Sequence, residues 1–294
     1  MSDFLTTREL AVLLRVKERK VYELAAAGTL PVRRVTGKLL FPREEIETWL
    51  GTRSGETPVL ASVNGKEAAR PAVVVGSHDP LLEWALRESR SGIATFLDGA
   101  LDGLDRSAAG ECVAAGLHIP EESGWNVASV ADRFGKAPWV LIEWARRTRG
   151  LVMRTDLARK PRSLRDAKGL RLLCRQPEAG SELIFSQLLA CEKLRPQDFN
   201  LVGMERSESD LVSAIAANRA DIGLGLAASA RQFGLDFVPL VNERFDLLVW
   251  RKAYFDQPFQ KFVKFCALPA FHAKAEDLGG YDISGFGTVH FNGS

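Results

Sequence analysis

Residues 6–50 read TTRELAVLLRVKERKVYELAAAGTLPVRRVTGKLLFPREEIETWL, and this stretch predicts a compact domain of three short helices and a β-hairpin. The first helix begins with a capping box, in which the Thr6 hydroxyl and the Glu9 carboxylate each accept a hydrogen bond from a free backbone N–H group. An apolar stripe at helical spacing follows, consisting of Leu10, Leu13 and Leu14. We expect this stripe to face the core.

A second helix is predicted at about residues 17–27. Val21 and Leu24 form its buried face, and Gly28 follows at the position where a left-handed residue commonly ends a helix. Two short helices joined by a tight turn are typical of the helix-turn-helix motif.

A hairpin and a third helix complete this domain. Two β-prone runs, 30–35 and 38–41, flank Thr36-Gly37 and predict the hairpin. Pro42 then occupies a favoured first-turn position of a helix. The apolar residues that close this helix are Ile46, Trp49 and Leu50. The order of helix-turn-helix, hairpin and helix predicts a winged helix-turn-helix.

Positive charge is concentrated on the second helix and the hairpin. Residues 15–43 contain eight basic and two acidic side chains, a net charge of +6. Lys and Arg side chains in such a position contact DNA phosphates. A charge run alone is more often a solvated surface, but its coincidence with the helix-hairpin-helix order predicts binding to double-stranded DNA.

Residues 6–50 also resemble the excisionase-like helix-turn-helix modules that are related to the MerR winged group. The resemblance implies that the second helix enters the major groove and that the wing holds the DNA backbone. The DNA-binding residues expected in and beside the second helix are Arg15, Lys17, Arg19, Lys20 and Tyr22. The residues expected in the wing are Arg33, Arg34 and Lys38.

Composition places the rest of the chain among ordinary globular proteins. Of 294 residues, 46% are hydrophobic and 26% are charged, and the net charge of +2 leaves an acidic remainder beyond the basic head. We therefore expect no nucleic-acid binding by that remainder. The absence of an 18-residue apolar run and the polar Met1-Ser2-Asp3 start predict a cytoplasmic protein without a membrane segment.

The cysteines indicate a reducing compartment. Cys112, Cys174, Cys191 and Cys266 form no CxxC pair, so we expect buried free thiols and neither a metal site nor a cofactor.

Apolar runs alternate with helical stripes beyond residue 70, which predicts an α/β unit in two lobes. Gly-, Ser- and Thr-rich sequence precedes it and predicts a linker. The predicted strands are 72–75, 94–97, 112–118, 139–144, 170–174, 199–204, 220–225, 237–240 and 245–250, with 150–153 leading into the second lobe. The predicted domains are 1–52 (head), 53–70 (linker) and 71–294, with lobe 1 at about 71–150 and 245–294 and lobe 2 at about 151–244.

Residues 73–289 resemble the periplasmic-binding-protein-like domains that are fused to regulators, relatives of molybdate-binding receptors and more distantly of the LysR effector domain. The blocks that carry the resemblance, in order, are GSHDPLLEWALRE, AGLHIPEESGWN, RRTRGLVM, LLCRQPEAGSE, NRADIGLGLAASARQFGLDFVPL, ERFDLLV and LGGYDISGFGTV. The resemblance implies a hinged cleft that closes on a small ligand at the carboxyl ends of the strands.

The ligand-binding residues that the resemblance implies come from both lobes. In lobe 1 they are Ser77, His78, Asp79 and His118, and in lobe 2 they are Arg175, Gln176, Gly180, Ser181, Glu182, Ser209 and Gly225. A helix that starts at 180–181 offers N–H groups to an anion, Ser209 is expected to cap the next helix, and Gly225 is expected to let the backbone approach the ligand. Structural roles remain open: an N-cap for Ser77, a buried core position for His118 and a simple helix start at 180–181.

Two departures from the relatives bear on the ligand. Gly99-Ala100 lacks the hydroxyl that relatives carry after this glycine, and residues 178–182 read EAGSE where relatives often have GSGTR. The carboxylates of Glu178 and Glu182 disfavour a small anion, because unpaired negative charge is costly to desolvate. The effector is therefore open between a molybdate- or tungstate-type oxyanion, a polar organic metabolite and a cation-bearing ligand.

The leading functional hypothesis is a ligand-responsive transcriptional regulator that acts as a homodimer or higher oligomer, since operator half-sites are about 34 Å apart. One alternative is an excisionase-like DNA-binding accessory factor whose second domain binds a protein. Catalysis is not expected, because the sequence has no P-loop, GxSxG, HExxH or strand-linked GxGxxG motif. Ser77, His78 and Asp79 are adjacent on one loop and cannot adopt the geometry of a catalytic triad. Cys174 lies beside Arg175, so an activated thiol at this position remains an open alternative.

We expect Arg19→Ala and Lys20→Ala each to weaken operator binding several-fold and to reduce its salt dependence, because each removes about one phosphate contact. Fluorescence anisotropy at several salt concentrations measures both effects, and thermal unfolding should be nearly unchanged. Unaltered affinity in both variants would rule out the second helix as the recognition helix.

Overall fold

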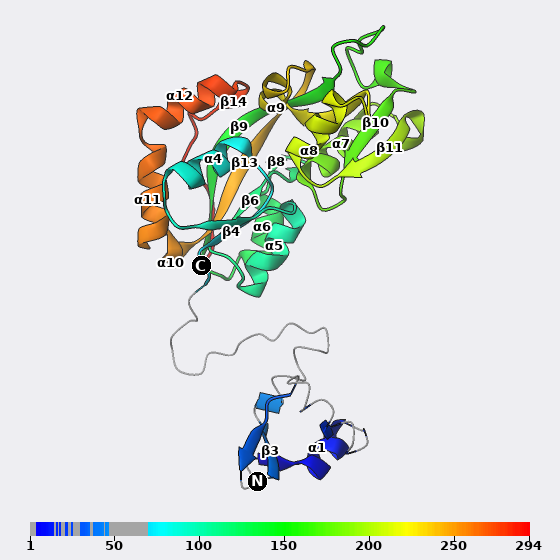
Figure 1. Ribbon diagram of the computed structural model, residues 1–294. Helices are drawn as coiled ribbons and strands as arrows, with labels where there is room; N and C mark the ends of the chain where they lie inside the picture. The colour runs from blue at the N-terminus through cyan, green and yellow to red at the C-terminus, as the bar shows by residue number, and fades with distance from the viewer. Residues whose placement is uncertain are drawn as a thin grey trace. The chain divides into compact units, whose positions relative to one another are not determined.

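The chain forms two compact units, Met1–Ala68 and Ala69–Ser294 (Figure 1). The computed structural model describes residues 4–14, 16, 18, 21–22, 25, 30–35, 38–43, 45–46 and 70–294. The predicted linker at 53–70 lies outside these residues except for Arg70.

The first unit contains a three-stranded antiparallel sheet in the order β1-β3-β2. Its elements are β1 (Phe4–Thr6), α1 (Thr7–Leu14), β2 (Arg33–Val35) and β3 (Lys38–Pro42). The predicted hairpin is present, since β2 and β3 pair up to Val35 and Lys38 at the turn. The predicted capping box is also present: the Thr6 N–H donates to the Glu9 carboxylate at 2.8 Å, and the Glu9 N–H donates to the Thr6 hydroxyl at 3.3 Å.

The core of the first unit follows the predicted apolar pattern only in part. Leu10, Val21, Phe41 and Ile46 are fully buried, as expected. Leu13 is 46% exposed, so the predicted stripe does not bury this residue. Gly28 and the side chains of Leu14, Leu24, Trp49 and Leu50 lie outside the described part of the head.

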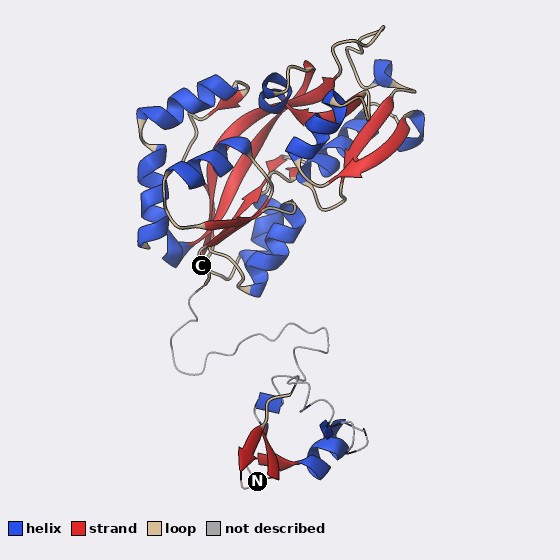
Figure 2. Ribbon diagram, in the orientation of Figure 1, coloured by secondary structure: helices blue, strands red, loops and turns tan. Residues whose placement is uncertain are grey.

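A ten-stranded mixed sheet runs through the second unit in the order β11-β10-β12-β9-β13-β6-β4-β5, with β14 and β15 also paired to β9 (Figure 2). Its strands are β4 (Val73–Gly76), β5 (Ala94–Phe96), β6 (Ala114–Leu117), β9 (Trp139–Met153), β10 (Arg171–Arg175), β11 (Asn200–Glu205), β12 (Ile222–Leu226), β13 (Asp236–Trp250), β14 (Tyr281–Asp282) and β15 (Val289–Asn292). The short strands β7 (Pro120–Glu121) and β8 (Gly124–Trp125) form a separate pair.

Two long antiparallel strands, β9 and β13, connect the lobes. They pair with each other from Met153 and Asp236 at one end to Trp139 and Trp250 at the other. The separate strands predicted at 237–240 and 245–250 are one continuous strand, and residues 139–153 are another. Charged residues lie inside both strands, and several of them are paired with opposite charges.

Helices cover both faces of each half of the sheet (Figure 2). In lobe 1 they are α4 (Pro80–Glu88), α5 (Ala100–Ala109), α6 (Val127–Phe134), α10 (Arg251–Tyr254), α11 (Gln257–Cys266) and α12 (Pro269–Leu278). In lobe 2 they are α7 (Gly180–Cys191), α8 (Glu208–Ala216) and α9 (Ala227–Gln232), with single 3-10 turns at Arg165–Ala167 and Pro196–Asp198.

Alternating strand residues build a separate core on each face. In lobe 1, Val74 and Leu247 pack with α4, α11 and α12, whereas Val75 and Leu248 pack with α5 and α6. In lobe 2, α7 packs over one face, and α8 with α9 covers the other.

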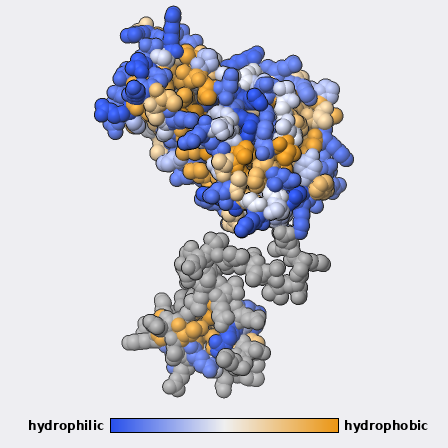
Figure 3. All heavy atoms as spheres, turned by 180° about the vertical axis from the view of Figure 1, so that it is seen from behind, coloured by the Kyte–Doolittle hydropathy of each residue, from blue (hydrophilic) through white to orange (hydrophobic). Residues whose placement is uncertain are grey.

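No helix within the described residues is long and apolar enough to cross a membrane. Figure 3 shows a mainly hydrophilic surface on the second unit with apolar areas between polar ones.

Trp144 is the centre of an aromatic cluster and makes a sharp test of the lobe 1 core. Its ring is fully buried and lies 5.3–5.6 Å from the rings of Phe262, Phe271 and Phe286. We expect Trp144→Ala to lower the free energy of unfolding by about 3–5 kcal/mol, because it leaves a large cavity. Urea unfolding of the full chain measures the loss, and Phe255→Ala, at an aromatic ring that is 74% exposed, should cost far less. Equal midpoints for the two variants would contradict the assigned core.

Candidate functional site

The carboxyl ends of the parallel strands meet between the two lobes. Ser77 follows β4 and His118 follows β6 on the lobe 1 side. Arg175 ends β10 and Ser181 lies in the first turn of α7 on the lobe 2 side. The topology of the sheet therefore brings these four predicted residues, two from each lobe, to one place.

These residues surround a closed inner cavity of about 10 Å³, which is space for about one water molecule. The residues that line it are Ser77, His78, Gly99, His118, Arg149, Arg175, Ala179, Ser181 and Glu208. The hydroxyl of Ser77 is buried and has no hydrogen-bond partner among the described residues. One neutral polar group thus faces the cavity unsatisfied.

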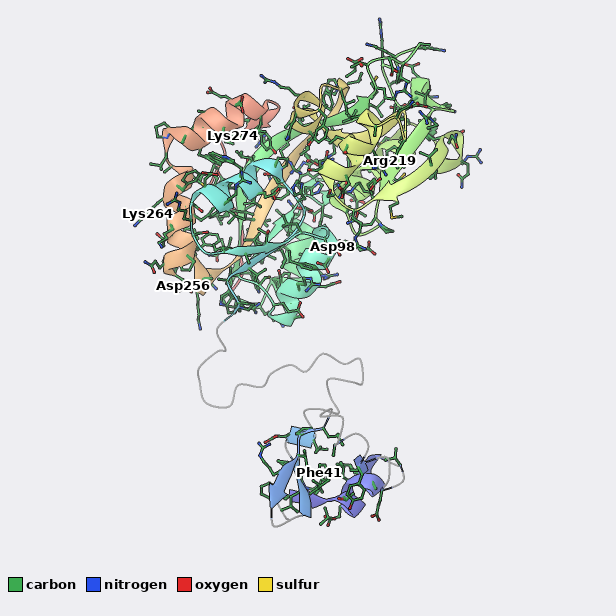
Figure 4. The ribbon with its side chains drawn as sticks, in the orientation of Figure 1. Phe41, Asp98, Arg219, Asp256, Lys264 and Lys274 are labelled. Carbon is green, nitrogen blue, oxygen red and sulfur yellow. The ribbon has the colours of Figure 1, made fainter. Side chains whose placement is uncertain are left out.

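The lobes touch directly beside the inner cavity. Asp98, labelled in Figure 4, is the lobe 1 residue that pairs with Arg206 of lobe 2 at 2.5 Å. The Gln176 side-chain amide donates to the Asp98 carbonyl at 3.2 Å, and the Leu101 N–H donates to the Glu178 carbonyl at 3.2 Å. The structure therefore shows the cleft in a closed arrangement.

Two predicted glycines fit this closed arrangement. A Cβ atom at Gly180 would lie 2.7 Å from His118 Nε2, so the start of α7 approaches the lobe 1 histidine only because it lacks a side chain. Gly99, at a φ of 124°, would place a Cβ 2.7 Å from the Glu178 carbonyl oxygen.

Asp79 has a structural role and not the predicted ligand contact. Its Oδ1 accepts from the Leu82 N–H at 2.7 Å and from the Trp144 indole at 3.0 Å. Its Oδ2 accepts from Arg147 at 2.8 Å and from the Tyr281 hydroxyl at 2.6 Å. With four donors and no exposed surface, this carboxylate has little capacity left for an effector, and it caps α4 in the role considered for Ser77.

Glu243 on β13 is the centre of the buried charges. Arg149 donates to both of its oxygens, from Nε at 2.9 Å and from a terminal nitrogen at 3.1 Å. Arg147 forms a further ion pair with it, and His118 Nδ1 is 2.9 Å away. Burial alone would raise the pKa of Glu243, but Arg147 and Arg149 hold that pKa well below its usual value.

The sequence left His118 open between a buried core position and a ligand contact. It is a buried histidine that is hydrogen-bonded to Glu243, and it also lines the inner cavity. Burial lowers its pKa to about 4, which outweighs the opposing effect of Glu243. The ring is therefore neutral at pH 7.

Arg147, Arg149, Glu208 and Glu243 were not among the predicted site residues. Arg147 and Arg149 stand two apart on one strand and so point to the same side of the sheet. Buried charges at alternate positions of a strand with apolar ends are a signal that the sequence contained. The carboxylates had no comparable signal, because they come from distant elements.

Three other predicted site residues have different positions from those expected. Glu182 is turned into lobe 2, where it accepts from the Arg175 N–H at 3.2 Å, and burial raises its pKa. The N-cap of α8 is Ser207 and not Ser209, since the Ser207 hydroxyl accepts from the Asp210 N–H at 3.0 Å. Gly225 makes room for the carboxylate of Glu208, which a Cβ would approach to 2.9 Å.

Gln176 and His78 lie at the edges of the closed cleft. Gln176 Oε1 and His78 Nδ1 are buried and lack hydrogen-bond partners within the described part of the chain. His78 Nε2 is 2.9 Å from the Glu83 carboxylate. His78 also separates the inner cavity from a larger outer hollow.

The outer hollow has a volume of about 430 Å³ and opens between α4 and α12 of lobe 1 and α8 and α9 of lobe 2. The residues that line it are His78, Pro80, Glu83, Trp84, Arg87, Ser209, Ala228, Arg231, Gln232, Lys274, Asp277 and Leu278. Ser209 thus lies at this hollow and not at the inner cavity. The volume is in the range of small-molecule sites.

The thiols offer no activated nucleophile in this region. Burial raises the pKa of Cys174 to about 12, which argues against the thiolate considered from its neighbour Arg175. All four cysteines are free, but only Cys112 and Cys266 are buried, and Cys191 is exposed, contrary to expectation. Within the part of the chain that the structure describes, no group of three or more His, Cys, Asp or Glu side chains is placed to hold a metal ion.

The predicted DNA-binding residues are described only in part. Tyr22 is 52% exposed, and Arg33 pairs with Glu45 at 2.7 Å on the surface of the head. Arg34 and Lys38 belong to β2 and β3, but their side chains are outside the description. Arg15, Lys17, Arg19 and Lys20 lie outside the described residues altogether.

Comparison with known proteins agrees with this architecture. The family model of the PBP superfamily domain matches residues 83–267, more than half of the chain. The chain belongs to the PBP superfamily. A helix-turn-helix domain model matches residues 4–54, so the protein joins a helix-turn-helix DNA-binding domain to a PBP domain. The predicted fold class is thereby confirmed.

One relative and two solved structures are similar to this chain. The uncharacterized protein YvgK of Bacillus subtilis (strain 168) is 24% identical over 301 residues, which cover 97% of this chain and 96% of that protein. A substrate-binding protein with bound phosphate from Clostridium perfringens is 10% identical, with a TM-score of 0.53 over 70% of this chain and 96% of its own. Corynebacterium glutamicum OxyR is 14% identical, with a TM-score of 0.49 over 93% of this chain and 89% of its own.

The buried state of His118 in this PBP domain predicts a pH dependence of stability. Its folded pKa of about 4 lies below the ordinary value of about 6.5, so the unfolded chain binds a proton that the folded chain does not between these pH values. The free energy of unfolding should therefore fall, as pH falls from 6.5 to 4, by up to about 1.4 kcal/mol per pH unit from this group.

Urea unfolding across this pH range tests the assignment. His118→Gln should show a shallower fall than the parent protein, whereas His272→Gln, at an exposed histidine, should keep the parent slope. Identical slopes in all three proteins would show that His118 is not buried in its neutral form.

Proposed function

We propose that this protein is a cytoplasmic, ligand-responsive regulator of transcription whose effector binds between the two lobes of its PBP domain. The observation that carries the proposal is the convergence of Ser77 and His118 from lobe 1 with Arg175 and Ser181 from lobe 2 on one buried cavity. A helix-turn-helix domain on the same chain supports DNA as the target of the signal.

An effector would act by changing the balance between lobe arrangements. A ligand shifts such a balance only if it binds one arrangement more tightly than the other. Asp98 of lobe 1 contacts Arg206 and Gln176 of lobe 2, and these polar contacts hold the lobes together. A compound bound across the cleft would therefore either add to these contacts or break them. We propose that the chain is at least dimeric and presents two winged heads, since paired half-sites are about 34 Å apart.

The size of the site limits how an effector can enter. The inner cavity of about 10 Å³ holds no more than about one water in the closed arrangement, so an effector must part the lobes or extend past His78 into the outer hollow of about 430 Å³. Both an oxyanion and a polar organic metabolite are compatible with such a path.

The test begins with selection of an operator from random duplex DNA by the full-length protein. Thermal unfolding then screens molybdate, tungstate, sulfate and a panel of polar metabolites, since a ligand at a hundredfold excess over its Kd stabilises the folded state by about 2.7 kcal/mol. A compound that raises the midpoint should also change the operator affinity. Recovery of no specific DNA would contradict the proposal, and an operator affinity that no compound alters would favour the accessory-factor alternative.

Ser77→Ala locates the site of the active compound. Removal of this buried hydroxyl should raise the Kd of the compound roughly 3- to 10-fold, the value of one neutral hydrogen bond, and leave operator binding without effector unchanged. Ser213→Ala, at an exposed serine on α8, is the matched control and should bind as the parent does. An unchanged Kd in Ser77→Ala would place the effector outside the inner cavity.

A further inference from the structure

Two buried guanidinium groups reach the inner cavity and would, by themselves, make it an anion site. Arg149 comes from β9 and is 1% exposed, and Arg175 comes from the end of β10 and is 8% exposed. Arginine pairs at such positions commonly bind carboxylate or phosphate groups. Here, however, an anion of the chain already occupies the position.

That anion is the carboxylate of Glu208, the first residue of α8. One oxygen lies 3.2 Å from an Arg149 nitrogen and 3.5 Å from an Arg175 nitrogen. The other oxygen accepts from the Leu226 N–H at 2.6 Å. Glu208 is 2% exposed, so it is enclosed among these partners.

The backbone beside Glu208 is shaped to hold this carboxylate. A Cβ atom at Gly225 would lie 2.9 Å from the Glu208 oxygen and 2.7 Å from a methyl group of Val152. A side chain at position 225 would therefore displace the carboxylate from the Leu226 N–H. Gly225 was expected to let the backbone approach a ligand, but it makes room for the Glu208 carboxylate of the protein itself.

The buried charges are balanced without any ligand. Arg147, Arg149 and Arg175 face Asp79, Glu208 and Glu243, three charges of each sign, all of them less than a tenth exposed. His118 adds no charge at pH 7, because burial lowers its pKa to about 4. An additional anion would make this desolvated region negative, and one that displaced Glu208 would leave that carboxylate buried without its partners.

Two groups around the inner cavity still lack partners. They are the Ser77 hydroxyl and His78 Nδ1, each buried and without a hydrogen-bond partner in the described residues. Each can exchange a hydrogen bond with a hydroxyl or an amide group.

We propose that Glu208 is a built-in anion that determines effector specificity: it neutralises Arg149 and Arg175, and the cavity takes an uncharged polar group, such as a hydroxyl or amide, of an organic compound. Inorganic oxyanions are excluded by this arrangement. The inference rests on the proposed function only in assigning the inner cavity to the effector.

Titration with sulfate and with molybdate, by calorimetry at matched ionic strength, tests the role of Glu208. The full-length parent protein should show no specific binding of either anion. Glu208→Gln keeps an oxygen for the Leu226 N–H but removes the negative charge beside Arg149 and Arg175, so it should bind both anions roughly tenfold or more tightly than any residual binding by the parent. Glu205→Gln is the matched control. It removes the same negative charge, but the Glu205 side chain pairs with Arg219 and does not line the inner cavity.

A second variant guards against a general effect of the substitution. Glu208→Gln combined with Arg175→Gln should lose most of the gained anion affinity, while circular dichroism confirms that both variants are folded. If Glu208→Gln does not fold, specific binding of either anion by the parent would still overturn the inference. Equal anion affinity in the parent and in Glu208→Gln, or specific molybdate binding by the parent, would overturn the inference.

These outcomes are separate from those of the proposed function. Molybdate binding by the parent that also changed operator affinity would refute the role of Glu208 and leave the regulator intact. Gained anion binding in Glu208→Gln, with no compound that alters operator affinity, would support the role of Glu208 and count against the regulator.

Discussion

A buried pairing of arginines with carboxylates at the junction of the lobes is the constraint on which the second unit depends. Arg147 and Arg149 lie on the same face of β9, and both reach Glu243 on β13. Arg147 also reaches Asp79 in lobe 1, whereas Arg149 reaches Glu208 in lobe 2. Because an unpaired buried charge is strongly destabilising, arrangements of the lobes in which both arginines keep their counter-ions are favoured. These ion pairs join the β9–β13 ladder to Asp79 at the start of α4 and to Glu208 at the start of α8.

The C-terminal segment braces the lobe 1 side of the same junction. β14 pairs with β9 at Tyr281 and Arg147, and the Tyr281 hydroxyl donates to Asp79 at 2.6 Å. β15 pairs with β9 nearer its start, at Ile142 and Leu141. Beyond Thr148, β9 is bordered by β12 of lobe 2, and the register of β13 shifts between Pro239 and Val241. A second register shift lies between Phe245 and Asp246 on the lobe 1 side, so the ladder is irregular on both sides of the hinge.

Local patterns in the sequence predicted what depends on local physics. Alternating apolar runs identified the strands of both lobes, and the Thr6–Glu9 spacing identified a capping box that the structure contains. The pattern failed where charges are buried, because RRTR at 146–149 resembles a break in a strand until its partners are known. Glu243 and Glu208 lie 94 and 59 residues from Arg149, and only the folded topology reveals that they are its counter-ions. Ser209 was predicted to cap a helix beginning at Leu211, but α8 begins at Glu208 and Ser207 is its cap.

Because Met153 pairs with Asp236, most of lobe 2 is an insertion between the adjacent ends of two neighbouring strands. The chain leaves β9 after Met153 and returns at Asp236, its direct partner on β13. The 82 intervening residues, 154–235, are therefore a single insertion whose two ends are held together by the pairing of these strands. The entropy of closing such an insertion grows only slowly with its length. Insertions, deletions or exchange of loops within lobe 2 therefore place little strain on the ladder or on lobe 1. Such an architecture lets one half of the cleft diversify while the other half and its connection to the DNA-binding head stay unchanged.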